Sequence, residues 1–150
     1  MLPEGSKEAW QQATTNWNER DTSTPPDDSF ATFGRWSMDM VQRMHAAGVP
    51  IGAGTDTPIG YALPGDSLHT ELERLVEAGL SPMDAIIAAT VRPAEFLSLS
   101  DEMGNVEVGM RADLVLLDAN PLEDIKNTRR IDRVVSAGRV MSPDELLNNR

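Results

Sequence analysis

The sequence contains no cysteine and only two histidines among its 150 residues. The absence of cysteine excludes disulfide bonds, zinc sites built from thiolates and cysteine nucleophiles. Two histidines are too few for a zinc site made of histidine alone, because such sites usually take about three or four protein ligands. No segment approaches the roughly 20 consecutive apolar residues that a membrane-spanning helix needs. We therefore expect no membrane partner and little scope for metal chemistry within the chain itself.

Positive charge is also scarce. The chain carries 13 Lys and Arg against 24 Asp and Glu, a formal net charge of −11. Phosphate backbones repel such a chain, so no nucleic-acid partner is expected. The first ten residues lack the basic start and apolar run of a signal peptide. The sequence thus favours the cytoplasm by default, with a signal peptide upstream of Met1 as the alternative.

The N-terminal part combines a helical pattern with a polar connection. Trp10 and Trp17 lie seven residues apart, which is typical of an amphipathic helix that packs on a neighbour, with ligand stacking as the alternative. The polar stretch 18–29 contains Pro25 and Pro26 and predicts a loop. We expect this region to connect elements and not to carry chemistry.

The next segments predict a helix followed by a buried strand. Trp36, Met40 and Met44 recur at helical spacing and predict a helix over about 35–47, which Gly48 ends. Residues 49–54 form a short apolar run rich in small residues, which indicates a strand buried on both faces. A helix followed by such a strand is typical of parallel α/β sheets.

Two more helices and a short third one are expected before residue 100. Leucines at helical spacing predict a helix that begins near residue 68 and ends at Gly79. Ser81 is the predicted N-cap of the next helix, with Asp84 three residues later reaching back to it. A Pro at residue 93 interrupts that helix, and a short helix follows over 93–97.

After residue 100 the pattern changes to strands. Alternation between glycines predicts an exposed strand over 104–109, and apolar runs predict two more. Gly138 marks a tight turn, and Ser142 opens a terminal helix with a capping-box pattern. The remaining predicted elements are strands 112–118, 131–137 and 139–141 and one helical turn within 122–127.

Asp56 is the leading candidate for chemistry because it follows the predicted strand 49–54. Active sites of parallel α/β folds form where strands end and the following loops line one crevice. A carboxylate there can bind a divalent metal or accept a proton from water. The alternative is that Asp56 caps a turn formed with Thr57 and Pro58.

His69 follows Asp56 by 13 residues, near the start of the next predicted helix. It either reaches the same crevice or is a surface imidazole on the first helical turn. His45 lies in the middle of a predicted helix, where it needs no functional role. Asp66 and Glu71 lie near the beginning of a helix, which the helix dipole explains.

Four segments resemble the C-terminal part of the metal-dependent amidohydrolase superfamily, above all its imidazolonepropionase-like and prolidase-like members. AGVPIGAGTDT at 47–57 resembles the eighth barrel strand with its terminal Asp. LHTELERLVEAGLSPMDAIIAATVRPAEFL at 68–97 resembles the helices that follow it. GNVEVGMRADLVLLDANPLEDI at 104–125 and NTRRIDRVVSAGRV at 127–140 resemble the end of the family's sequence.

The resemblance implies an α/β fold. Members have a (β/α)8 TIM barrel flanked by a β-sandwich built from both ends of the chain. Residues 1–100 would form the last barrel unit or units, with strand eight at 49–54. Residues 101–150 would form the C-terminal strands of the composite sandwich and a terminal helix.

The resemblance also implies a mechanism. In the family one or two divalent metal ions, often zinc, activate water for hydrolysis of a carbon–nitrogen bond in an amide or lactam. The strand-eight Asp binds metal, takes the proton of the attacking water and delivers it to the leaving group, and this role falls on Asp56. His69 matches a histidine common in this subgroup and is expected to contact the substrate or a metal ligand.

The family's other metal ligands have no counterpart here. The chain lacks a His-x-His pair, and it is shorter than the roughly 250 residues of a complete barrel. We therefore expect a C-terminal fragment whose partners are the missing N-terminal barrel portion and a small-molecule substrate, and which alone neither hydrolyses amides nor retains zinc. The alternatives are a non-catalytic assembly or interaction module derived from an amidohydrolase and a simple acidic ligand-binding domain.

Overall fold

The computed structural model describes residues 8–9, 11–12, 15, 28–57 and 63–148. Residues 8–9, 11–12 and 15 are helical, and four helices of the described structure follow them: α2 (Ser29–Ala46), α3 (Asp66–Glu77), α4 (Pro82–Ala89) and α5 (Val91–Phe96). A small sheet and two short helical segments follow: β1 (Leu114–Leu117), the 3-10 helix η1 (Ile125–Arg129), β2 (Ile131–Ser136), β3 (Arg139–Met141) and α6 (Pro143–Asn148). The predicted change from helices to strands near residue 100 is confirmed.

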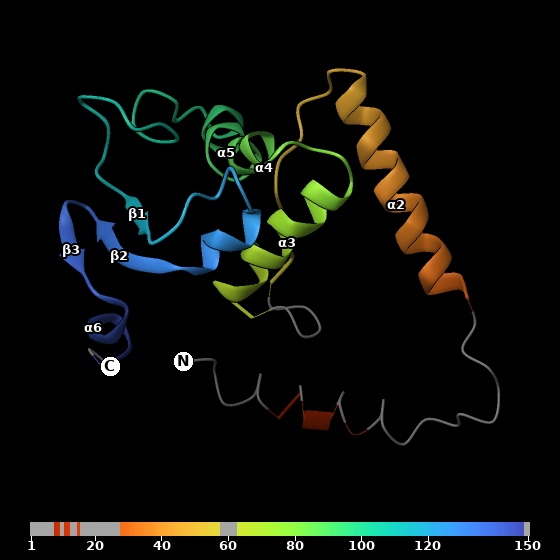
Figure 1. Ribbon diagram of the computed structural model, residues 1–150, viewed down its shortest axis with the longest axis horizontal. Helices are drawn as coiled ribbons and strands as arrows, with labels where there is room; N and C mark the ends of the chain where they lie inside the picture. Colours follow the sequence, from red (N-terminus) through yellow and green to blue (C-terminus); the bar gives the residue numbers. More distant parts are fainter. Residues whose placement is uncertain (1–7, 10, 13–14, 16–27, 58–62, 149–150) are drawn as a thin grey trace.

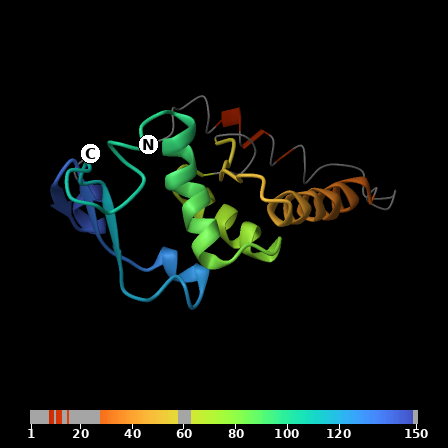
Figure 2. The ribbon, with the colours of Figure 1, turned by 90° about the horizontal axis from the view of Figure 1, so that it is seen from above.

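The helices α3, α4 and α5 form the middle of the described structure. The sheet lies on one side of this group and α2 on the other, in both views (Figures 1 and 2). The 3-10 helix η1 lies beside α3, between that helix and the sheet. The group α3–α5 therefore connects the segment that precedes it with the C-terminal sheet.

The helix ends follow the predicted capping residues. Gly48 and Gly79 adopt the positive φ angles 77° and 103° directly after α2 and α3, a conformation that glycine tolerates best. The Ser81 hydroxyl accepts a hydrogen bond from the backbone N–H of Asp84 at 3.1 Å, so it caps α4 as predicted. Ser142 and Glu145 form the expected reciprocal capping box of α6.

The sheet is a three-stranded antiparallel meander in the order β1-β2-β3. Leu114 pairs with Val135, which pairs in turn with Val140. A two-residue turn joins β2 to β3, with φ 48° at Ala137 and 82° at Gly138. Positive φ at both central residues is the geometry that matches the twist of a hairpin.

Two predicted strands are absent from the described structure. Residues 104–109 form turns, and Val106 and Val108 lie in solvent. Residues 49–54 also form no strand, because the described part of the chain brings no other strand beside them. Trp10 and Trp17 lie outside the described residues, and the described residues 8–9, 11–12 and 15 of this expected helix are helical. The division into a barrel part and a sandwich part remains a prediction.

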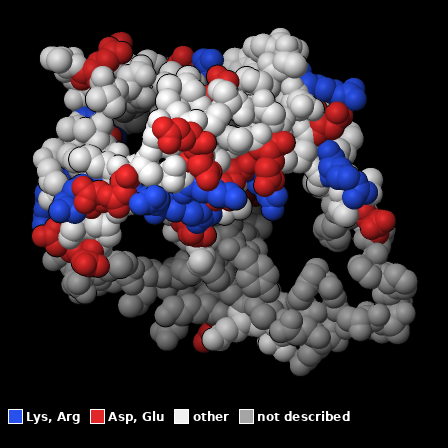
Figure 3. Space-filling model, in the orientation of Figure 1, with Lys and Arg blue, Asp and Glu red and all other residues white. Residues whose placement is uncertain are grey.

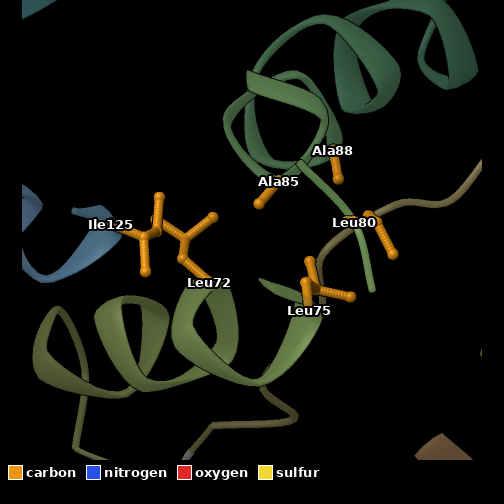
Figure 4. Packing of buried hydrophobic residues seen from close by; sticks show 6 residues of the cluster. All are labelled: Leu72, Leu75, Leu80, Ala85, Ala88 and Ile125. Atoms are coloured by element: carbon orange, nitrogen blue, oxygen red, sulfur yellow. The ribbon is translucent and has the colours of Figure 1, made fainter. Parts of the chain in front are cut away.

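The core lies between α3, α4 and η1. Its buried side chains converge in Figure 4: Leu72, Leu75, Leu80, Ala85, Ala88 and Ile125. Ile51 and Ala53 pack against this cluster from the segment before Asp56. The fully buried alanines at 85 and 88 let α4 approach α3 closely. The core thus holds both the 49–54 segment and the 3-10 helix against α3.

Candidate functional site

Asp56 lies at the end of a segment that helices hold in place. The backbone N–H of Ala53 donates to the carbonyl of Ala88 in α4 at 2.8 Å. The next N–H, of Gly54, donates to Glu71 Oε1 in α3 at 3.3 Å. In the described structure these two bonds take the place of the hydrogen bonds that a neighbouring strand would make with this segment. They fix the backbone immediately before Asp56.

The Asp56 backbone adopts φ 51°, in the left-handed region that Asp tolerates better than most residues. Its side chain is exposed. The hydroxyls of the flanking Thr55 and Thr57 lie 2.7 Å apart and form a hydrogen bond. Asp56 therefore presents a solvent-accessible side chain from a residue with left-handed backbone geometry. Its role in binding a ligand or metal stays a prediction.

His69 is half-buried on α3, where it faces η1. Its Nδ1 lies 3.0 Å from the hydroxyl of Thr128, which itself lies 2.8 Å from the carbonyl of Ile125. Burial lowers the pKa of the His69 imidazole, and the positive charge of Arg129 lowers it further. The imidazole is therefore mostly neutral at neutral pH.

Arg129 fastens η1 to α3 beside His69. Its guanidinium binds Asp66 Oδ1 at 2.6 Å, Glu73 Oε1 at 2.9 Å and Thr70 Oγ1 at 2.9 Å. The hydrogen bond to Glu73 is the main cause that raises the pKa of Arg129. Basic and acidic side chains also lie next to one another across the face of the molecule shown in Figure 3. Asp66 therefore binds Arg129 in addition to the favourable interaction with the helix dipole that the sequence predicts for it.

The sequence-predicted residues do not form one cluster. Among the described residues, no hydrogen bond or ion pair joins Asp56 to His69. The two are linked indirectly, because α3 carries both His69 and the Glu71 side chain that binds the Gly54 amide. His45 lies on α2, where its Nε2 is 3.8 Å from Asp84 Oδ2. It has no described contact with either candidate, in agreement with its interpretation as a helix residue.

The described residues do not supply a complete metal site. No group of three or more His, Asp or Glu side chains among them could hold a metal ion. A hollow of about 510 Å³ lies between residues 50–53 and α5, but neither Asp56 nor His69 lines it. Asp56 is thus a single carboxylate, whereas a metal ion in a catalytic site usually needs about three protein ligands. No described helix is both long and apolar enough to cross a membrane.

Comparison with known proteins decides the family. The sequence pattern of the Amidohydrolase family matches residues 35–141, a range that includes Asp56 and His69. The chain belongs to the amidohydrolase family. The resemblance found in the four sequence segments is therefore confirmed, and with it an α/β amidohydrolase fold at the level of the family.

Individual amidohydrolases match different shares of the chain. Ochratoxinase from Aspergillus niger is 42% identical over 82 residues, which are 53% of this chain and 16% of the enzyme. Imidazolonepropionase from Shouchella clausii is 29% identical over 102 residues, 65% of this chain and 23% of the enzyme. The crystal structure of a Xaa-Pro dipeptidase with bound methionine superposes with a TM-score of 0.64 at 32% identity, covering 70% of this chain and 25% of that one.

The coverage values also show how small a part of these enzymes the chain matches. It spans about a quarter or less of the length of these relatives. Both the imidazolonepropionase-like and the prolidase-like similarities expected from the sequence are present. Sequence reasoning missed Glu71, Thr128 and Arg129 as partners of the candidate residues. Thr128 lies 59 residues from His69, and spacing along the chain carries no signal for a contact at that separation.

Proposed function

We propose that this chain is the C-terminal part of a metal-dependent amidohydrolase that hydrolyses carbon–nitrogen bonds of the amide or lactam type. The observation that carries this proposal is the family match across 35–141, with Asp56 exposed at the end of an anchored segment. Amidohydrolases generally use divalent metal ions. Because the described residues form no metal cluster, the remaining ligands and the substrate loops would come from a barrel portion outside these residues.

In this proposal Asp56 has two functions in the assembled site. Its carboxylate is one metal ligand, and it accepts the proton of the attacking water and passes it to the leaving nitrogen. The side chain is exposed, so it is free to contact groups from another part of the enzyme. The hydrogen bonds of Ala53 to Ala88 and of Gly54 to Glu71 hold the segment just before Asp56, which lowers the cost of placing the carboxylate on assembly.

The proposed fold assigns the two parts of the structure to two units. Residues 49–54 would become barrel strand eight when neighbouring strands pair with them, and α3–α5 would close the barrel. The sheet β1-β2-β3 would be the C-terminal share of the flanking sandwich. The exposed apolar side chains Val115 and Val140 on opposite faces of this sheet fit a unit that packs on both sides.

The test mixes the chain with a separately produced N-terminal barrel portion and assays a panel of dipeptides, N-acyl amides and lactams in the presence of zinc. We expect hydrolysis by the mixture and none by either part alone. Asp56→Asn should reduce kcat at least about a hundredfold, as the loss of a general base does. Asp101→Asn, an exposed aspartate elsewhere in the chain, is the matched control and should retain full activity.

Other outcomes separate the alternatives. A stable complex that hydrolyses none of the panel would favour the non-catalytic interaction module. A mixture in which Asp56→Asn is as active as the unchanged chain would refute the role of Asp56 while leaving the family assignment intact.

A further inference from the structure

A hydrogen-bond relay connects His69 to the backbone of η1. The Thr128 side chain is nearly buried, with 8% exposure, and its Oγ1 lies 2.8 Å from the carbonyl of Ile125. A carbonyl only accepts, so this contact is a hydrogen bond when the single hydroxyl proton of Thr128 points there. The same Oγ1 lies 3.0 Å from His69 Nδ1. Both contacts are hydrogen bonds at the same time only if the proton between Oγ1 and Nδ1 belongs to Nδ1.

We propose that Thr128 is a positioning residue that locks His69 in the Nδ1–H tautomer and thereby leaves Nε2 unprotonated, as a hydrogen-bond acceptor. The contacts of Thr128 with His69 and Ile125 carry this proposal, and it does not depend on the proposed function. In a neutral imidazole one ring nitrogen donates and the other accepts, so fixing Nδ1 as the donor also fixes Nε2 as the acceptor.

The surroundings of the ring keep it neutral. Arg129 lies next to Thr128 in sequence, and its guanidinium is held against α3 by Asp66, Thr70 and Glu73. Its positive charge opposes a second proton on His69, in the same direction as burial. The carboxylates of Asp66 and Glu73 act in the opposite direction, each more weakly than Arg129. Burial is the largest cause, so the pKa of the imidazole is lowered.

A fixed acceptor restricts what this imidazole can bind. Neutral Nε2 attracts an N–H or O–H group and offers nothing to a carbonyl oxygen or a carboxylate. A group that binds His69 through Nε2 would therefore carry an N–H or O–H donor.

The tautomer is tested on the chain itself by NMR. Two-bond proton–nitrogen correlation of the uniformly ¹⁵N-labelled chain distinguishes protonated from unprotonated ring nitrogens. His45→Gln assigns the two imidazoles, since the chain has only two histidines. We expect a protonated Nδ1 at His69, retained in Thr128→Ser, which keeps the hydroxyl. In Thr128→Val, which removes it, the proton should redistribute toward Nε2.

The matched control is Thr70→Val. Thr70 also contacts Arg129, but its hydroxyl makes no described bond to His69, so the tautomer should not change. A protonated Nε2 in the unchanged chain, or a Thr128→Val spectrum identical to it, would overturn the proposal. Far-UV circular dichroism of each variant verifies that the fold is retained.

Discussion

Replacement of Ile125 by alanine tests whether the core holds η1 against α3. Ile125 is 5% exposed and points at Leu72 across the core in Figure 4. The substitution removes three carbon atoms, which at about 0.8 kcal/mol each corresponds to about 2.4 kcal/mol of lost burial. The cavity left behind raises the expected loss to about 3 kcal/mol. For a chain of this size, that lowers the melting temperature by about 6–12 °C.

The assay is thermal unfolding followed by far-UV circular dichroism, with two companions to Ile125→Ala. Ile125→Val removes one carbon atom and should cost about 1 kcal/mol. Val108→Ala changes a side chain that lies entirely in solvent and should leave the melting temperature unchanged. A shift for Ile125→Ala no larger than that of Val108→Ala would show that η1 does not pack on the core as described.

Three further predictions concern a turn, a cap and a titrating side chain. Ala137→Asn should raise the free energy of unfolding by about 1 kcal/mol, because asparagine tolerates the φ of 48° at this turn position better than alanine. The melting temperature measures this effect. A lower melting temperature would contradict the turn geometry. Ser81→Ala should lower the free energy of unfolding by about 1 kcal/mol through loss of the α4 cap, whereas Ser81→Asp should restore it; urea unfolding measures both. The folded state lowers the pKa of His69, so the unfolded chain binds the extra proton more readily. Stability is then full above the ordinary pKa of 6.5 and declines as pH falls from there toward the lowered value. Urea midpoints at about pH 7.5 and pH 5.5 should differ less in His69→Gln than in the unchanged chain, and equal differences would contradict the shift.

The helices and the hairpin could be predicted because local residues specify them. Ser81, Gly79 and Gly138 act within a few residues of their own position, and each does in the structure what its type predicts. The strands at 49–54 and 104–109 could not be predicted reliably in this way. A strand exists only with a partner, and the apolar run or alternation that suggests one says nothing about whether the partner is present.

The candidate site rests on one residue that the sequence points to. Asp56 is a candidate because it follows an apolar run, and its role stays a prediction; the structure shows its side chain exposed. The residues that hold the neighbouring backbone and helices in place could not be identified from the sequence. Glu71 reaches the amide of Gly54 over 17 residues, and Arg129 reaches Asp66 over 63. Such contacts arise from tertiary packing, so they become visible only when the helices are placed.

The unpaired 49–54 segment has a kinetic consequence for its amide hydrogens. The N–H of Ala53 is bonded to a helix carbonyl and that of Gly54 to a side chain, whereas in the described structure Gly52 and Thr55 have no such acceptor. Exchange with deuterated water should therefore be slow at residue 53, intermediate at 54 and fast on either side. If strands from another polypeptide pair with both edges of this segment, protection should spread to successive amides, because these point alternately to the two neighbouring strands. Residue-resolved exchange before and after mixing would then record the formation of a barrel wall around Asp56.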